Sequence, residues 1–134
     1  MKPRKILISG LILMLLAVAL GAFGAHALKS MMSAAQLTIW KTASNYHFYH
    51  ALALIGLGIW AERHAQAKAA VLAGILFIGG ILVFSGSLYL LAVSGVRWLG
   101  MLTPIGGVLF LAGWVSWLMA VINSPPSNNR QDAD

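Results

Sequence analysis

The sequence predicts an all-α integral membrane protein, built as an antiparallel bundle of four helices with both termini in the cytoplasm. Of its 134 residues, 60% are hydrophobic and only 9% are charged, which is far from the composition of soluble domains. The apolar residues form runs of about 20, the length needed to cross a hydrocarbon core of roughly 30 Å. Short polar breaks separate these runs, and the chain is short enough to form a single domain.

The first predicted span covers residues 6–28 and follows three basic residues, Lys2, Arg4 and Lys5. A cleaved signal peptide is the alternative, since Ala25-His26-Ala27 resembles a small-x-small cleavage site. The apolar run is longer than the 7–15 residues typical of a signal peptide, and three more apolar runs follow, so we keep it as a span.

Small residues recur every four positions in this first span, at Ala17, Gly21 and Ala25. Small side chains let a neighbouring backbone approach closely within a membrane. We therefore expect this flank of the helix to be buried against protein.

The second span is predicted over residues 43–61. Ser33 and Gln36 have the spacing of a capping box, which predicts a helix that begins near Ala34 and continues into the span. The first two turns of the span carry Tyr46, His47 and His50. His47 and His50 are three residues apart and so share one helical face.

The third and fourth spans are predicted over residues 69–93 and 104–122. Ser94-Gly95 is expected to end the third span, and Thr103-Pro104 is typical of an N-cap residue followed by proline at the first helical position. Residues 123–134 are rich in Pro, Ser, Asn and Asp, and we expect them to form a disordered cytoplasmic tail.

Orientation follows from the Lys and Arg residues in the breaks, because cytoplasmic loops carry an excess of these residues. Six lie on the side of the N-terminus, the 62–68 turn and the tail, whereas the opposite side holds Lys29, Lys41 and Arg97. Both termini are therefore predicted to be cytoplasmic. The scattered placement of these charges favours membrane orientation over nucleic-acid binding.

Polar side chains gather in the outer halves of the predicted spans. We call this set the outer cluster; its members are His26, Tyr46, His47, His50, Ser85, Ser87, Tyr89 and Thr103. The inner halves are almost wholly apolar, so any cavity should open outward and end partway through the membrane.

Three interpretations of the histidines remain open. His26, His47 and His50 could supply three imidazoles to a metal ion or a haem, although no carboxylate is near to support such a site. The histidines could also bind an organic or lipid ligand, or hydrogen-bond neighbouring helices. The residues require no cofactor.

Catalysis and transport are both disfavoured by the residues present. Ser85 and Ser87 lack a carboxylate partner for a catalytic triad, and the chain has no cysteine nucleophile. A small transporter would need an ionisable group at depth, and no Asp, Glu, Lys or Arg lies inside a predicted span. We expect a non-enzymatic protein whose partner is the lipid bilayer. Its small-residue faces could serve packing within the chain or self-association as a homodimer, and the sequence does not separate the two.

Four stretches in order resemble the YgdD-like family of small bacterial inner-membrane proteins, a domain of unknown function. They are Gly21-Ala22-Phe23-Gly24-Ala25-His26, Trp40 with Thr42-Ala43 leading to Tyr46 and His50-Ala51, Phe84-Ser85-Gly86-Ser87-Leu88-Tyr89, and Thr103-Pro104-Ile105-Gly106-Gly107. His47 lies outside the second motif. The resemblance covers most of the chain and implies a four-helix, multi-pass protein of the bacterial inner membrane. It implies no substrate or reaction.

Overall fold

The computed structural model describes residues 1–64 and 68–124, and within them it contains helices and short connections but no strand. The elements in chain order are α1 (Pro3–His26), η1 (Leu28–Ser30), α2 (Ala34–Arg63), α3 (Lys68–Gly80), η2 (Ile81–Ser85), α4 (Gly86–Ser94), η3 (Arg97–Leu102) and α5 (Thr103–Ile122). The prediction of an all-α protein is confirmed.

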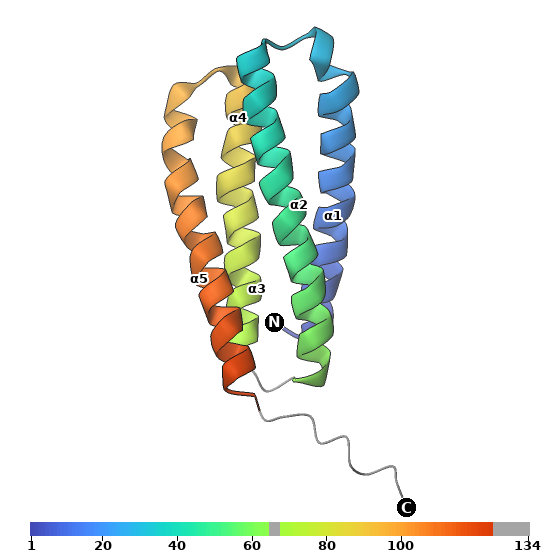
Figure 1. The fold of residues 1–134 in the computed structure, drawn as a ribbon, viewed down its shortest axis with the longest axis vertical. Coiled ribbons are helices and arrows are strands. Elements are labelled where there is room, and N and C mark those ends of the chain that lie inside the picture. Colours follow the sequence, from blue (N-terminus) through green and yellow to red (C-terminus); the bar gives the residue numbers. More distant parts are fainter. Residues whose placement is uncertain (65–67, 125–134) are drawn as a thin grey trace, which may run out of the picture.

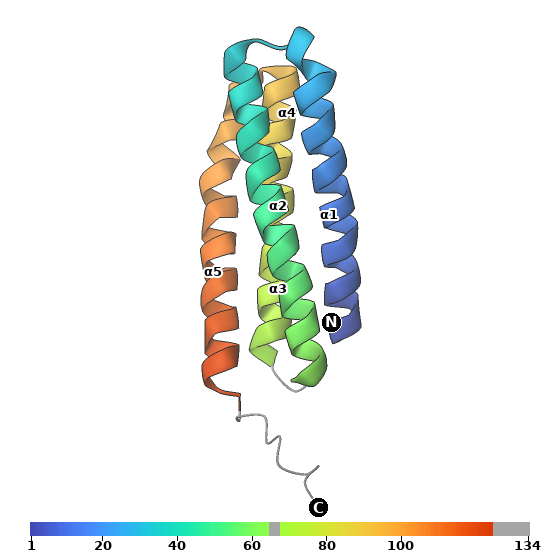
Figure 2. The same ribbon diagram turned by 45° about the vertical axis from the view of Figure 1, so that its right-hand side comes forward.

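These elements form four long rods that lie side by side, because η2 joins α3 to α4 without a break (Figure 1). Consecutive rods run in opposite directions, and α1 begins at the same end of the molecule at which α5 finishes (Figure 2). The opposite end carries η1 and η3, and we call it the η1–η3 end. In the described residues, three stretches are long and apolar enough to cross a membrane: Pro3–Ser30, Lys68–Ser94 and Arg97–Ile122.

The main apolar core lies among all four rods. Ile6 of α1, Leu54 and Leu57 of α2, and Phe77 of α3 are completely buried there, and Phe110 of α5 packs against them. Each of these side chains gains roughly 1.5–3 kcal/mol when it leaves water. In a membrane, apolar side chains have already left water before the helices pack against one another. The contacts between the helices therefore stabilise the fold through close packing.

α1 packs against α2 along a face that includes Ile6, Gly10, Ala17 and Gly24. The predicted burial of the Ala17, Gly21 and Ala25 flank is correct for Ala17 only, since Gly21 is half-buried and Ala25 is exposed. The reason is helical geometry. Steps of four residues drift by about 40° each around the helix, whereas the seven-residue steps of the observed face drift by only about 20°.

α2 begins where the capping box predicted. The Ser33 backbone N–H donates to Gln36 Oε1 at 2.9 Å, and the Gln36 N–H donates to Ser33 Oγ at 3.3 Å. The helix then runs without interruption through 30 residues, and it packs against α1 on one side and against α3, η2 and α4 on the other. It shares the middle of the bundle with the third rod, and its side chains reach α1, the third rod and, through His50 and Trp114, α5.

The third rod is not a uniform α-helix. Ile81–Ser85 forms one turn of π-helix between α3 and α4, a feature that the apolar pattern did not predict. π-Turns add a residue to one turn and are common at functional sites. The predicted break after the rod is confirmed, because Gly95 caps α4 with a left-handed φ of 70° that only glycine adopts without strain.

The prediction that Thr103 caps α5 is wrong. η3 winds directly into α5, so Thr103 already has helical angles (φ −56°, ψ −45°), and its N–H donates to the Gly100 carbonyl. No free N–H is left for its side chain to cap, and Thr103 Oγ1 is buried without a hydrogen-bond partner. Pro104 does lie in the first turn, as predicted. Of the predicted tail, residues 125–134 lie outside the described residues.

Close approach of α1 and α2 depends on Gly58. A Cβ at this position would lie 2.7 Å from the backbone N and Cα of Leu7, which cannot move aside as a side chain could. We predict that Gly58→Ala lowers stability by about 1–3 kcal/mol. Thermal unfolding in detergent measures this effect.

Gly107→Ala is the matched control, because a Cβ there meets nothing within 4 Å. The same substitution should be neutral or slightly stabilising at this position, where only the gain in helix propensity of about 1 kcal/mol acts. Equal melting temperatures for the two variants would contradict the described helix contact.

Candidate functional site

Polar side chains of α2 form hydrogen bonds to each of the other three rods. Near the start of α2, Gln36 Nε2 donates to the Ala92 carbonyl of α4 at 3.0 Å. One turn later, Trp40 Nε1 donates to the Leu20 carbonyl of α1, also at 3.0 Å. Both acceptors are main-chain oxygens of neighbouring helices, so these bonds fix α2 between α1 and α4.

Tyr89 of α4 meets two polar residues of α2. Its hydroxyl donates to Ser44 Oγ at 3.2 Å and also lies 3.4 Å from His47 Nδ1. A phenol has one proton, so it can donate to only one of these acceptors at a time. His47 is only 4% exposed, and its Nε2 has no hydrogen-bond partner.

His50 connects α2 to α5 with both of its ring nitrogens. Nδ1 lies 2.8 Å from the Tyr46 carbonyl, and Nε2 lies 3.3 Å from Trp114 Nε1. A carbonyl only accepts and an indole N–H only donates, so the imidazole is neutral, with its proton on Nδ1. The ring also stacks on Phe110, with centroids 3.5 Å apart and planes inclined by 9°. His50 is thus fully engaged within the chain.

Three further members of the outer cluster, on α2 and on the third rod, pack within the bundle. Tyr46 is 41% exposed and packs its ring on Phe84, with centroids 4.5 Å apart. Ser87 donates to the Phe84 carbonyl at 3.0 Å, which is a bond within its own rod. Ser85 lies in the π-turn, is completely buried, and has no partner for its hydroxyl. These positions pack and do not converge on a common space.

His26 is separated from the other histidines. It is exposed at the end of α1, two residues beyond Gly24, which packs on Trp40. From Trp40 to His50 is ten residues, or about 15 Å along the helix. His26 is therefore too far away to share a ligand with His50.

The three histidines considered above for a metal or haem site are consequently not brought together. Both nitrogens of His50 are occupied, which leaves no free lone pair for a metal. In the ranges 1–64 and 68–124, no three His, Cys, Asp or Glu side chains come close enough to hold a metal ion.

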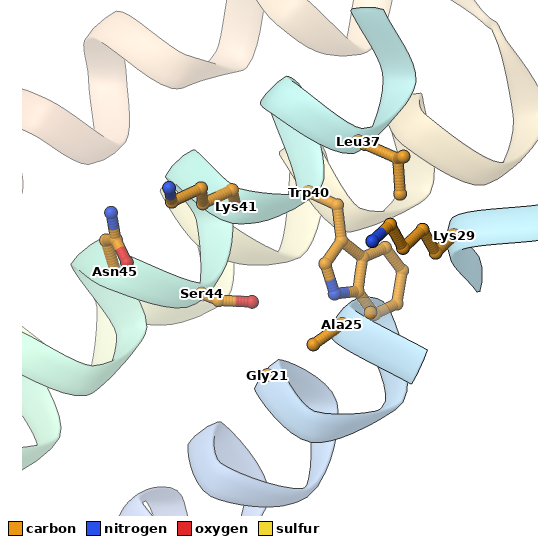
Figure 3. Close-up of a pocket in the computed structure, with 9 residues that line it drawn as sticks. Gly21, Ala25, Lys29, Leu37, Trp40, Lys41, Ser44 and Asn45 are labelled. Atoms are coloured by element: carbon orange, nitrogen blue, oxygen red, sulfur yellow. The ribbon is translucent and has the colours of Figure 1, made fainter. Parts of the chain in front are cut away.

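A pocket of about 460 Å³ opens between α1 and α2 near the η1–η3 end (Figure 3). We call it the α1–α2 pocket; it is lined by Gly21, Gly24, Ala25, Lys29, Leu37, Trp40, Lys41, Ser44 and Asn45. None of these belongs to the outer cluster. The two basic residues come from different elements, Lys29 from η1 and Lys41 from α2.

Sequence reasoning missed this pocket, although its signals are present in the sequence. Gly21 and Ala25 lie on one face of α1, and Lys41 and Asn45 lie on one face of α2, each pair four residues apart. Small residues opposite long polar ones leave a hollow between two helices. In the sequence, Lys29 and Lys41 served only to predict the orientation of the chain in the membrane.

A second pocket, of about 420 Å³, lies between the third rod, η3 and α5. Its lining is apolar except for the Ser87 hydroxyl, which already bonds within its own helix. It offers no charged group to select a ligand.

The bonds at His50 generate a stability prediction. His50→Ala removes the stacking on Phe110 and leaves the Trp114 N–H without its acceptor, so it should cost roughly 2–5 kcal/mol, as for other large-to-small changes in a core. His26→Ala is the control, because this exposed side chain makes no hydrogen bond in the described structure, and it should leave the melting temperature unchanged. Comparable losses in both variants would argue against the separate roles assigned here.

Comparisons with known proteins agree with the resemblance seen in the motifs. The family model described as "Protein of unknown function (DUF423)" matches residues 20–107, a range that contains all four motifs. No solved structure matches the chain.

Curated relatives match nearly the whole chain. The UPF0382 membrane protein YwdK of Bacillus subtilis is 42% identical over 119 residues, which are 89% of this chain and 97% of the relative. The UPF0382 membrane protein SSP2132 of Staphylococcus saprophyticus is 44% identical over 121 residues, 90% of this chain and 97% of the relative. The UPF0382 inner membrane protein YgdD of Escherichia coli K12 is 41% identical over 122 residues, 91% and 92% of the two chains. The chain therefore belongs to the DUF423 family, whose members here are UPF0382 membrane proteins.

Proposed function

We propose that this protein is a non-enzymatic, four-span protein of the bacterial inner membrane that binds a small hydrophobic molecule in the α1–α2 pocket. The observation that supports the proposal most strongly is the pocket itself. Its volume of about 460 Å³ falls within the range of small-molecule sites, roughly 300–1,000 Å³. Its walls are mostly apolar, with a few polar groups at one end that could orient a ligand.

The outer cluster has a different role in this proposal. Two of its members, Tyr89 and His50, make hydrogen bonds that join helices of the same chain, and His50 has no capacity left for a ligand. In lipid, a polar side chain without a partner is costly, so such bonds between helices favour one arrangement of the rods. The cluster stabilises the fold, and the pocket beside it binds.

A protein with four spans has α2 as one of them, although α2 is more polar than the other rods. Its position at the centre supports this assignment, because polar groups such as His47 and His50 are buried against protein and away from lipid. Its lipid-facing side carries Phe48, Leu52 and Ile59, all exposed and apolar. A span of this kind is tolerated because the polar groups face the interior.

The proposed orientation puts both termini in the cytoplasm and the η1–η3 end outside. It is supported by the six Lys and Arg residues on the side of the termini against three on the other. We expect a reporter that is active only in the cytoplasm to be active when fused after residue 134. A reporter that is active only outside should be active in a fusion ending in the 30–33 connection. Exchanged activities would overturn the orientation.

The binding proposal is tested with protein purified in mild detergent from its native membrane. Native mass spectrometry should detect a stoichiometric hydrophobic species, with elemental analysis and absorption spectra run beside it for metals and haem. Gly21→Leu should abolish binding, because a Cβ there meets nothing within 4 Å and Gly21 lines the pocket, so the larger side chain would occupy its space.

Gly107→Leu is the matched control. A Cβ at Gly107 also meets nothing within 4 Å, but this residue does not line the α1–α2 pocket. The control should retain the ligand, and both variants should melt as the parent does. A ligand that persists in Gly21→Leu, or a parent protein with nothing bound, would rule the proposal out. A bound metal lost in His50→Ala would favour the metal-binding alternative.

A further inference from the structure

We propose that the α1–α2 pocket selects an anionic phospholipid, with Lys29 and Lys41 pairing with the phosphate of its headgroup. This inference rests on the proposed function, since it names the ligand class of the same pocket. The argument follows from the charges at the pocket, from its shape, and from the poor fit of a second copy of the chain.

The lysines at the pocket have no acidic partner nearby. Among residues 1–64 and 68–124 the single acidic side chain is Glu62. Glu62 lies at the far end of α2, 21 positions after Lys41. This separation corresponds to about 30 Å along the helix. Two ammonium groups at one pocket without a counter-charge favour an anion, and in a membrane the abundant anion is a lipid phosphate.

The position of the pocket fits a headgroup with an acyl chain below it. Lys29 and Lys41 lie near the η1–η3 end, where helices leave the hydrocarbon region. Gly21 and Ala25 of α1 leave a shallow apolar floor in the pocket, with Gly21 on the side away from this end. Long basic side chains at helix ends reach up to the headgroup layer while their stems remain in apolar surroundings.

Trp40 contributes an apolar wall to the pocket. Its only N–H already donates to the Leu20 carbonyl, so the ring can pack on a glycerol backbone or an acyl chain but cannot bind the headgroup. Hydrogen bonds to the headgroup would come from Asn45, which is exposed and lines the pocket. The pocket thus combines charged and polar side chains with an apolar floor and an aromatic wall, as an amphiphile requires.

A second copy of the chain fits this surface poorly. A symmetric dimer in one membrane would bring the same face of both copies together at the same depth. Lys29 and Lys41 of each copy would then meet, with four like charges and no acidic residue among them in the described chain. Juxtaposed like charges oppose association, so the charges favour lipid over self-association at this face.

The test uses the full chain in mild detergent. Phosphatidylglycerol, phosphatidylcholine and inorganic phosphate are titrated separately, and binding is followed by native mass spectrometry and by tryptophan fluorescence. We expect phosphatidylglycerol to bind about thirtyfold more tightly than phosphatidylcholine, the preference that two lysines near an anionic headgroup would give. The preference should weaken as salt is added.

The variant Lys29→Gln with Lys41→Gln should bind both lipids equally. Arg97→Gln is the control, because Arg97 lies at the same end but does not line the pocket, and it should keep the preference. All of these side chains are exposed, so thermal unfolding should confirm that each variant folds.

The outcomes separate the two proposals. Equal binding of both lipids by the parent, or an unchanged preference in the double lysine variant, would overturn the headgroup inference. If Gly21→Leu still abolished lipid binding in that case, the pocket proposal would stand. Absence of binding by any hydrophobic molecule would overturn both. Inorganic phosphate that binds as tightly as phosphatidylglycerol would show an anion site without lipid selectivity and would also contradict the inference.

Discussion

The fold depends on the hydrogen bonds that the polar side chains of α2 make to the other rods inside the protein. His50 shows the constraint most clearly, because it accepts from Trp114, donates to its own helix, and stacks on Phe110. Gln36, Trp40 and Tyr89 make the corresponding contacts at other levels. Since α2 must contact α1, α4 and α5 to satisfy these groups, it shares the middle of the bundle with the third rod, which also contacts all of its neighbours.

Close backbone contact stabilises the other half of the structure. Gly10 and Gly58 bring the backbones of α1 and α2 together, and Gly106 and Gly113 let α5 approach the rings of Phe84 and Phe77. Both contacts suit a membrane, where apolar burial alone gives helices little reason to associate. The small residues left uncovered by this packing, Gly21 and Ala25, are those that form the floor of the α1–α2 pocket.

Local signals in the sequence predicted local features well. The capping box at Ser33 and the helix break at Ser94-Gly95 depend on a few neighbouring residues, and both predictions agree with the structure. Of the four predicted spans, three correspond to stretches that are long and apolar enough to cross a membrane, and α2 is not among them. Thr103 failed because a preceding 3-10 helix, which no local signal marks, removed the need for a cap. Contacts between rods, such as Trp114 with His50, depend on the rotation of each helix about its axis. Periodicity alone did not fix that rotation, so the separation of His26 from His50 and the pocket at Lys29 and Lys41 emerged only in three dimensions.

The central claim is that α2, despite its polar residues, crosses the membrane in the middle of the protein. The chain has no cysteine, so single cysteines can be placed along α2 and labelled in intact cells and in inverted vesicles with a maleimide that cannot cross membranes. The account predicts that Thr38→Cys reacts only from outside, Glu62→Cys only from the cytoplasmic side, and the lipid-facing Leu52→Cys from neither. Labelling of Thr38→Cys and Glu62→Cys from the same side would contradict it.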